Sequence, residues 1–192
     1  MLRNKIDKIR LLFCKDRESY SCFYRILGFY PRNIRLYEQA LLHKSTAVRS
    51  EKGRPLNNER LEFLGDAILD AIVGDIVYQH FEGKREGFLT NTRSKIVQRE
   101  TLNKLAVEIG LDKLIKYSTR SSSHNSYMYG NAFEAFIGAI YLDRGYECCK
   151  QFMERRIIEP YIDLDKLSRK EVNFKSKLIE WSQKTVSYTH LR

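Results

Sequence analysis

The sequence is poor in the features that mark several large classes of protein. Its 192 residues include only three prolines and four cysteines, and Cys14, Cys22, Cys148 and Cys149 show no Cys-x-x-Cys spacing. A disulfide scaffold of this length would need more cysteines, so a reducing compartment is expected. No apolar run approaches the roughly 20 residues that span a bilayer, and the first residues lack the apolar core of a signal peptide. We therefore expect a soluble, cytoplasmic protein without a membrane segment.

Several catalytic motifs are absent as well. The chain has no Gly-rich phosphate loop, no His-Glu-x-x-His pair and no Gly-x-Ser-x-Gly elbow. It also lacks the Glu-x-x-His pairs that a carboxylate-bridged di-iron bundle requires. The four histidines are therefore expected to be structural or solvent-exposed: His43, His80, His124 and His190.

Positive charge exceeds negative charge and is unevenly distributed along the chain. The 34 Lys and Arg residues against 24 Asp and Glu residues give a net charge of +10. Residues 1–58 carry +8, residues 59–143 carry −2 and residues 144–192 carry +4. Basic flanks around an acidic centre are typical of a protein that holds a polyanion beside a carboxylate site. On composition alone, a basic protein without an anionic partner is an equal alternative.

Helical periodicity dominates, and no segment alternates convincingly as a strand does. The 43% of apolar residues and 12% of aromatic residues suffice for a core. The fold class is therefore predicted to be all-α, a helical bundle. Helices are expected over residues 18–28, 35–44, 57–82, 89–109, 126–143, 147–159 and 173–184, and loops over 45–58 and 118–124.

The segment that begins at Asn57 carries the clearest candidate chemistry. On a helix its first three carboxylates share one stripe, and three apolar side chains form the opposite stripe, which should face the core. The acids are Glu59, Glu62 and Asp66, and the apolar residues are Leu61, Leu64 and Ile68. Phe63 falls on the acidic side, where it is exposed unless another surface covers it. Gly65 costs a helix about 1 kcal/mol, which indicates close approach by a neighbouring backbone. An ordinary solvated acidic face is the alternative.

A second acidic position lies in the apolar segment of residues 130–143. Asn131 and Glu134 are one helical turn apart there, among Phe and Ile residues. An ionised carboxylate in such surroundings needs a partner or a cation. Carboxylates from two helices, without a His or Cys cluster, are typical of a Mg²⁺ site, with Mn²⁺ as a substitute. An ion pair between Glu134 and Arg60 or Arg144 is the alternative.

These segments resemble the ribonuclease III family of double-stranded RNA endonucleases. The signature match is Asn58-Glu-Arg-Leu-Glu-Phe-Leu-Gly-Asp-Ala-Ile-Leu, and further matches begin at Ala40, Gly87 and Glu134. The resemblance covers about residues 18–160, and residues 173–181 resemble the opening helix of the RNA-binding domain that follows in this family. We therefore expect a catalytic domain over residues 1–162, a linker over 163–172, and over 173–192 the first helix of a truncated double-stranded RNA-binding domain.

The resemblance implies roles for individual residues. It makes Asp66, Glu134 and Glu59 catalytic, and it assigns metal binding to Glu62, Asp66, Asn131 and Glu134. Most members have an aspartate where this chain has Asn131, whose amide oxygen can bind Mg²⁺ but adds no negative charge. The resemblance implies an Mg²⁺-dependent enzyme that leaves 5′-phosphate and 3′-hydroxyl ends with short 3′ overhangs, with roles in rRNA and mRNA processing.

The resemblance also implies partners. The protein is expected to form a homodimer through the signature helix, with Phe63 in a socket of the partner subunit. Double-stranded RNA should be recognised by its A-form shape, phosphates and 2′-hydroxyls. Candidate RNA contacts are Arg93, Lys95, Ser176, Lys177 and Gln183. A catalytically silent module that binds structured RNA is the remaining alternative, and Asn131 is its only support.

Overall fold

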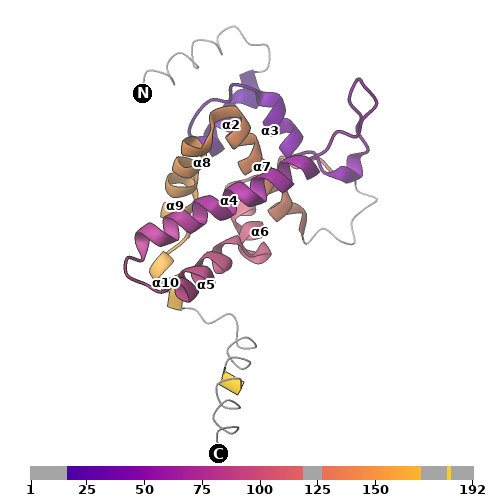
Figure 1. Ribbon diagram of the computed structural model, residues 1–192. Coiled ribbons are helices and arrows are strands. Elements are labelled where there is room, and N and C mark those ends of the chain that lie inside the picture. Colours follow the sequence, from indigo (N-terminus) through magenta and orange to yellow (C-terminus); the bar gives the residue numbers. More distant parts are fainter. Residues whose placement is uncertain (1–16, 119–126, 170–180, 183–192) are drawn as a thin grey trace, which may run out of the picture. The chain divides into compact units, whose positions relative to one another are not determined.

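A computed structural model describes residues 17–118, 127–169 and 181–182 of the chain (Figure 1). The chain divides into two compact units, Met1–Ile162 and Asp163–Arg192. The helices of the first unit are α2 (Arg17–Leu27), α3 (Ile34–Ala40), the 3-10 turn η1 (Lys44–Thr46), α4 (Glu59–His80), α5 (Glu86–Val97), α6 (Arg99–Glu108), α7 (Met128–Arg144), α8 (Tyr146–Phe152), the π-helix η3 (Met153–Ile158) and α9 (Glu159–Tyr161). In the second unit the described helix is α10 (Leu164–Arg169).

The described residues contain helices and no β-strand, so the all-α prediction is confirmed. Extended pairing within them is limited to isolated bridges, which join Leu42 to Lys116 and Arg49 to Pro55. In this part of the chain, no helix is both long and apolar enough to cross a membrane.

One predicted helix is in fact two. The helix expected over residues 89–109 is interrupted at Gln98, whose extended backbone (φ −63°, ψ 145°) separates α5 from α6. The Gln98 side-chain amide donates a hydrogen bond to the Thr101 hydroxyl (3.1 Å), which donates to the Lys95 carbonyl (2.8 Å). These bonds satisfy polar groups at the junction and let α6 start in a new direction. The helix predicted over 35–44 also ends early, at Ala40. The helix predicted over 173–184 and the loop over 118–124 lie largely outside the described residues.

Helix α7 is the central helix of the first unit. It packs against α3, α4, α6 and α8, and Figure 1 shows α4 running across the unit beside it. Phe133, Phe136, Ile137 and Ile140 are buried along α7, as the sequence predicted. The Phe136 ring centroid lies 5.5 Å from that of Tyr37 and 6.2 Å from that of Phe152. Because the core surrounds α7, packing determines where its few polar side chains lie.

Helices α4 and α7 are in direct backbone contact at two glycines. A Cβ atom built on Gly65 would lie 1.7 Å from the carbonyl oxygen of Glu134, and one built on Gly138 would lie 2.4 Å from the carbonyl oxygen of Leu61. Real Cβ atoms do not approach a backbone so closely, so only glycine fits at either position. The close approach that the sequence indicated at Gly65 is therefore confirmed.

The buried seam of α4 differs from the predicted core stripe. It follows Leu61, Gly65, Leu69 and Ile72, whereas Leu64 and Ile68 are only half-buried. The prediction was wrong for Leu64 and Ile68 because α7 packs on the glycine side of α4, next to the acidic stripe rather than opposite it. The acids therefore flank a helix contact.

A polar cluster ties the end of α7 to the chain before α3. The Asp143 carboxylate accepts hydrogen bonds from the backbone nitrogens of Arg32 (2.9 Å) and Asn33 (2.8 Å). Arg144 pairs with Asp143 at 3.6 Å and donates a hydrogen bond to the Tyr30 carbonyl. Since Arg144 is engaged there, about 15 Å along the helix from Glu134 at about 1.5 Å per residue, the ion pair between Glu134 and Arg144 is not formed.

Candidate functional site

A cleft of about 540 Å³ lies beside the contact of α4 with α7. Its walls come from the chain before α4, from α4 itself, from the α5–α6 junction and from α7. The lining residues are His43, Lys44, Asn58, Glu59, Glu62, Phe63, Asp66, Val97, Gln98, Arg99, Asn131 and Glu134. The structure therefore brings every residue predicted to be catalytic or metal-binding to one cleft.

The glycine contact accounts for the proximity of the acids. Glu62 and Asp66 lie one turn apart on α4, on either side of Gly65 in the sequence, and Glu134 is the residue whose carbonyl oxygen meets Gly65. Asn131 lies one turn before Glu134 on α7, and its side chain donates a hydrogen bond to the Glu62 carboxylate. Two helices thus place three carboxylates and one amide beside each other.

Burial and crowding of negative charge alter the acidity of these groups. Burial, and then the neighbouring carboxylates of Asp66 and Glu62, raise the pKa of Glu134 to about 7. Burial also raises the pKa of Glu62, while Lys44 and the hydrogen bond from Asn131 act in the opposite direction. The raised values mean that the cleft disfavours its full set of ionised carboxylates.

The donor set fits a hard divalent cation. Carboxylate and amide oxygens are the ligands of Mg²⁺ and Mn²⁺. Burial and then repulsion from Asp66 and Glu62 raise the pKa of Glu134, and a bound cation would offset that repulsion. Within the described ranges, no group of three or more His, Cys, Asp or Glu side chains is already arranged to hold a metal ion. The residues that would hold the cation are Glu62, Asp66, Asn131 and Glu134.

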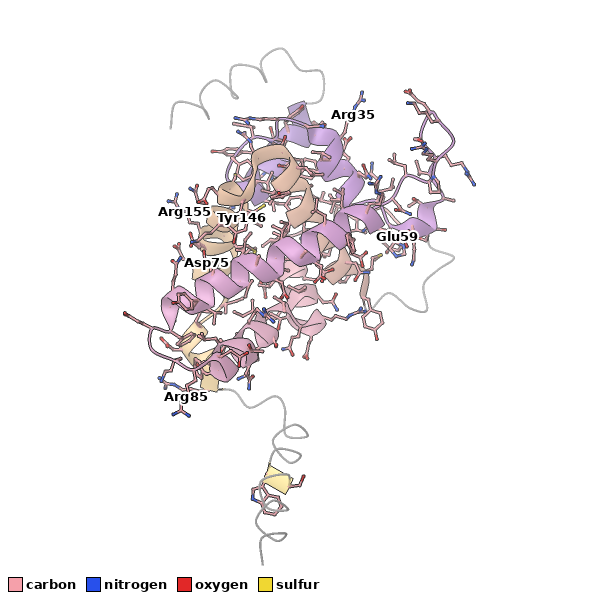
Figure 2. All side chains as sticks on the ribbon, in the orientation of Figure 1. Arg35, Glu59, Asp75, Arg85, Tyr146 and Arg155 are labelled. Atoms are coloured by element: carbon pink, nitrogen blue, oxygen red, sulfur yellow. The ribbon has the colours of Figure 1, made fainter. Side chains whose placement is uncertain are left out.

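Glu59 lies at the edge of this site. Its carboxylate pairs with the Lys44 ammonium at 3.2 Å and accepts a hydrogen bond from the Asn57 side-chain amide at 3.1 Å. Both partners of the ion pair are half-exposed. Figure 2 shows Glu59 at one end of α4 and Asp75 near the other. The position of Glu59 suits contact with a ligand at the cleft entrance.

Several lining residues were not singled out from the sequence, and three of them bring charge or a hydrogen-bond donor to the cleft. Lys44 and Arg99 bring positive charge to the cleft, although they lie far apart in the sequence. Asn58 is 2% exposed, and its side-chain nitrogen is buried without a hydrogen-bond partner among the described residues. Such a donor suits an oxygen atom of a ligand. Asn58 is the first residue of the signature segment, so the sequence could have indicated it as a site residue. An exposed Lys or Arg has no such indication in the sequence.

The residues predicted to contact RNA differ in their exposure and in whether the structure describes them. Arg93 lies on α5 and pairs with Asp70 of α4 at 3.8 Å, one turn beyond Asp66. Lys95 is only 5% exposed, which leaves little of its surface for direct contact with RNA. Ser176, Lys177 and Gln183 lie outside the described residues.

Phe63 is 82% exposed on α4, beside the acidic stripe. The sequence predicted this placement on the acidic side of the helix. Tyr78, four turns further along α4, is also exposed. A large aromatic ring in water favours coverage by another surface, so Phe63 remains the candidate for a subunit contact.

Comparison with known proteins identifies related sequences and structures. Residues 33–161 match a family model described as Ribonuclease-III-like. Over 96% of the chain, 92% of residues are identical to Ribonuclease 3 of Bacteroides thetaiotaomicron and 79% to Ribonuclease 3 of Phocaeicola vulgatus. The chain spans 59% and 60% of the lengths of these two relatives.

A solved structure of the nuclease domain of ribonuclease III from Campylobacter jejuni has a similar fold. It superposes with a TM-score of 0.64 at 32% sequence identity, covering 73% of this chain and 96% of that one. That structure was described for flexibility in a region involved in dimer formation.

Proposed function

Since the chain belongs to the ribonuclease III family, we propose that it is an Mg²⁺-dependent endonuclease that hydrolyses phosphodiester bonds in double-stranded RNA. One observation carries the proposal: the contact at Gly65 and Gly138 brings Glu62 and Asp66 of α4 to the same cleft as Glu134 of α7. The products are 5′-phosphate and 3′-hydroxyl ends with short 3′ overhangs, and the cellular roles are rRNA and mRNA processing. The product ends and the cellular roles are inferred from the resemblance of the signature segment to the ribonuclease III family.

The predicted site residues have defined tasks in this proposal. A Mg²⁺ ion, when bound, would supply Lewis-acid stabilisation of the phosphate charge and would activate the attacking water. Glu62, Asp66, Asn131 and Glu134 would supply oxygen ligands, and Asp66 and Glu134 would also orient the attacking water. Glu59 is the additional acid of the site, at the cleft entrance. Recognition relies on the phosphates and 2′-hydroxyls of the duplex.

Two cationic side chains favour the approach of an RNA backbone. Lys44 lies at the entrance beside Glu59, and Arg99 lines the wall at the start of α6. Without them, the carboxylates of the cleft would repel a phosphate. The buried Asn58 amide offers a further donor to a phosphate oxygen. Arg93, on the neighbouring α5, is a further candidate RNA contact, although its guanidinium pairs with Asp70 of α4.

The first test measures cleavage of a long RNA duplex by the 192-residue chain, with Mg²⁺ and with a chelator. Cleavage is expected only with Mg²⁺, and end-labelling should show 5′-phosphates. Single-stranded RNA of the same sequence is the substrate control, and a circular dichroism spectrum verifies the fold. A folded protein that leaves the duplex intact at all Mg²⁺ concentrations would favour the silent RNA-binding module instead.

The homodimer is part of the same proposal, with Phe63 as the contact residue. Phe63→Ala is expected to shift sedimentation equilibrium towards the monomer, since the substitution removes an exposed aromatic anchor; such anchors contribute about 2 kcal/mol or more at interfaces. Val107→Ala is the matched control, because Val107 is exposed on α6 and lies outside the cleft. An unchanged oligomeric state in Phe63→Ala would contradict this role.

A further inference from the structure

A short hairpin lies between η1 and α4 and covers residues 48–56. The Leu56 backbone nitrogen donates a hydrogen bond to the Val48 carbonyl at 2.8 Å. Nearer the tip, the Ser50 backbone nitrogen donates to the Arg54 carbonyl, also at 2.8 Å. Figure 1 shows this segment extending away from the helices, next to the end at which α4 begins. The segment that the sequence predicted only as a loop therefore has a defined backbone.

The tip of the hairpin is closed by its own hydrogen bonds. Gly53 has a φ of +72°, in the left-handed region that glycine adopts without strain. Its backbone nitrogen donates to the Ser50 carbonyl at 2.8 Å, and its carbonyl accepts from the Arg49 guanidinium at 2.8 Å. Side chains on a preformed backbone cost less ordering on binding than those of an unstructured loop. The tip is therefore suited to present charges to a ligand.

Positive charge is concentrated on this hairpin. It carries Arg49, Lys52 and Arg54 against one acid, Glu51, and all four residues are exposed. Within the part of the chain that the structure describes, none of the three cations forms an ion pair. Exposed cations are well solvated by water, so their position decides whether they serve a ligand.

The hairpin is attached at both ends to residues that line the cleft. Lys44 of η1 lies before it, and Asn58 lies two residues after it. The Asn58 backbone nitrogen donates to the Leu42 carbonyl at 2.9 Å, which ties the two ends together. Because extended residues rise about 3.3 Å each, Lys52 at the tip lies no more than about 20 Å from Asn58. A duplex presents phosphates densely along its length, so one with a phosphate in the cleft has others within that distance.

We propose that the hairpin of residues 48–56 is a second RNA-binding element, in which Lys52 and Arg54 contact phosphates of the duplex outside the cleft and Arg49 holds the tip in shape. The inference rests on the proposed function and adds a recognition surface to it. Contacts to phosphates carry no base information, so the hairpin contributes affinity and not sequence preference. It also makes affinity depend on length, because a duplex that only fills the cleft does not reach the tip.

The double variant Lys52→Gln with Arg54→Gln is expected to bind a long RNA duplex about tenfold more weakly at low salt. The slope of log affinity against log salt concentration should fall by about two, because each lost phosphate contact removes about one released counterion. In cleavage assays the loss should appear in KM rather than in kcat, since the reaction takes place in the cleft. Glu51→Gln should tighten binding by about twofold, because it removes a charge that repels phosphate.

Affinity is measured on the 192-residue chain by fluorescence anisotropy, with Ca²⁺ in place of Mg²⁺ and with RNA duplexes of increasing length. The effect of the hairpin variant should be absent for the shortest duplexes and full for the longest. Arg35→Gln with Lys104→Gln is the matched control, because it removes the same charge from exposed positions on α3 and α6, outside the cleft. It should bind as wild type does. Circular dichroism verifies the fold, and sedimentation equilibrium gives the oligomeric state.

The outcomes separate this inference from the proposed function. Equal affinity and salt slope of wild type and the hairpin variant, together with active cleavage by wild type, would overturn the role of the hairpin and leave the nuclease proposal intact. An equal loss of affinity in the control would also overturn it, since net charge rather than position would then decide. A changed oligomeric state of the hairpin variant would assign the hairpin to a subunit contact instead. A folded wild type that neither binds nor cleaves a duplex would overturn both proposals.

Discussion

Gly65→Ala is expected to destabilise the first unit by about 4 kcal/mol or more. The new methyl group would lie 1.7 Å from the carbonyl oxygen of Glu134, which is backbone and has no rotamer to change. The only relief is separation of α4 from α7, and these two helices form the largest contact of the core. Urea unfolding followed by far-ultraviolet circular dichroism measures the loss of free energy.

Gly74→Ala supplies the matched control on the same helix. Its Cβ would meet nothing closer than the Arg93 side chain at 3.8 Å, an ordinary contact distance. Alanine has the higher helix propensity, so this variant is expected to be as stable as wild type or more stable by about 1 kcal/mol. Equal unfolding free energies for Gly65→Ala and Gly74→Ala would contradict the backbone contact on which the site depends.

Glu134→Gln is expected to reduce duplex cleavage by about 1000-fold or more, because it removes an anionic ligand and an orienting group from the reaction centre. The same change should stabilise the metal-free protein. It removes the repulsion from Asp66 and Glu62 that helps to raise the pKa of Glu134 to about 7. If the free energy of unfolding rises by about 1 kcal/mol, the melting temperature without divalent ions should rise by about 2–4 °C.

Duplex cleavage measures the effect on catalysis, and thermal melts with and without Mg²⁺ measure the effect on stability. Mg²⁺ should raise the melting temperature of wild type, since a ligand stabilises the state that binds it, and should have less effect on Glu134→Gln. Glu108→Gln, an exposed acid of α6 outside the cleft, is the control and should behave as wild type in both assays. A destabilised Glu134→Gln in chelator would show that the carboxylate has a structural partner instead.

Local patterns in the sequence predict several parts of this architecture. The long apolar periodicity of residues 126–143 predicts α7 closely, and the mid-helix glycine at position 65 correctly indicates a backbone contact. The carboxylates on α4 fall in one stripe because helix geometry alone puts residues three and four apart on one face. For these features, the nearest neighbours in the chain supply the information.

Other features depend on contacts between distant segments, which periodicity does not register. The break at Gln98 involves no proline or glycine; it is stabilised by Thr101, whose hydroxyl caps the Lys95 carbonyl. The predicted core face of α4 differed from the observed one because a hydropathy pattern does not count a glycine as buried. Gly65 is nevertheless in direct contact with the backbone of α7. Arg99 lies directly after that break, at the start of α6, which packs against α7.

The cleft combines two kinds of support with different tolerance to change. Its floor is set by two glycines in backbone contact, and the acids there cannot move independently. Its rim before α4 is held by lighter ties: the bridge of Leu42 with Lys116, and the hydrogen bond from the Asn58 backbone nitrogen to the Leu42 carbonyl at 2.9 Å. Substitutions at the rim are therefore expected to alter how a ligand enters the cleft without moving Glu62, Asp66 or Glu134. The sequence of the cleft entrance can thus vary while the three carboxylates beside the helix contact keep their places.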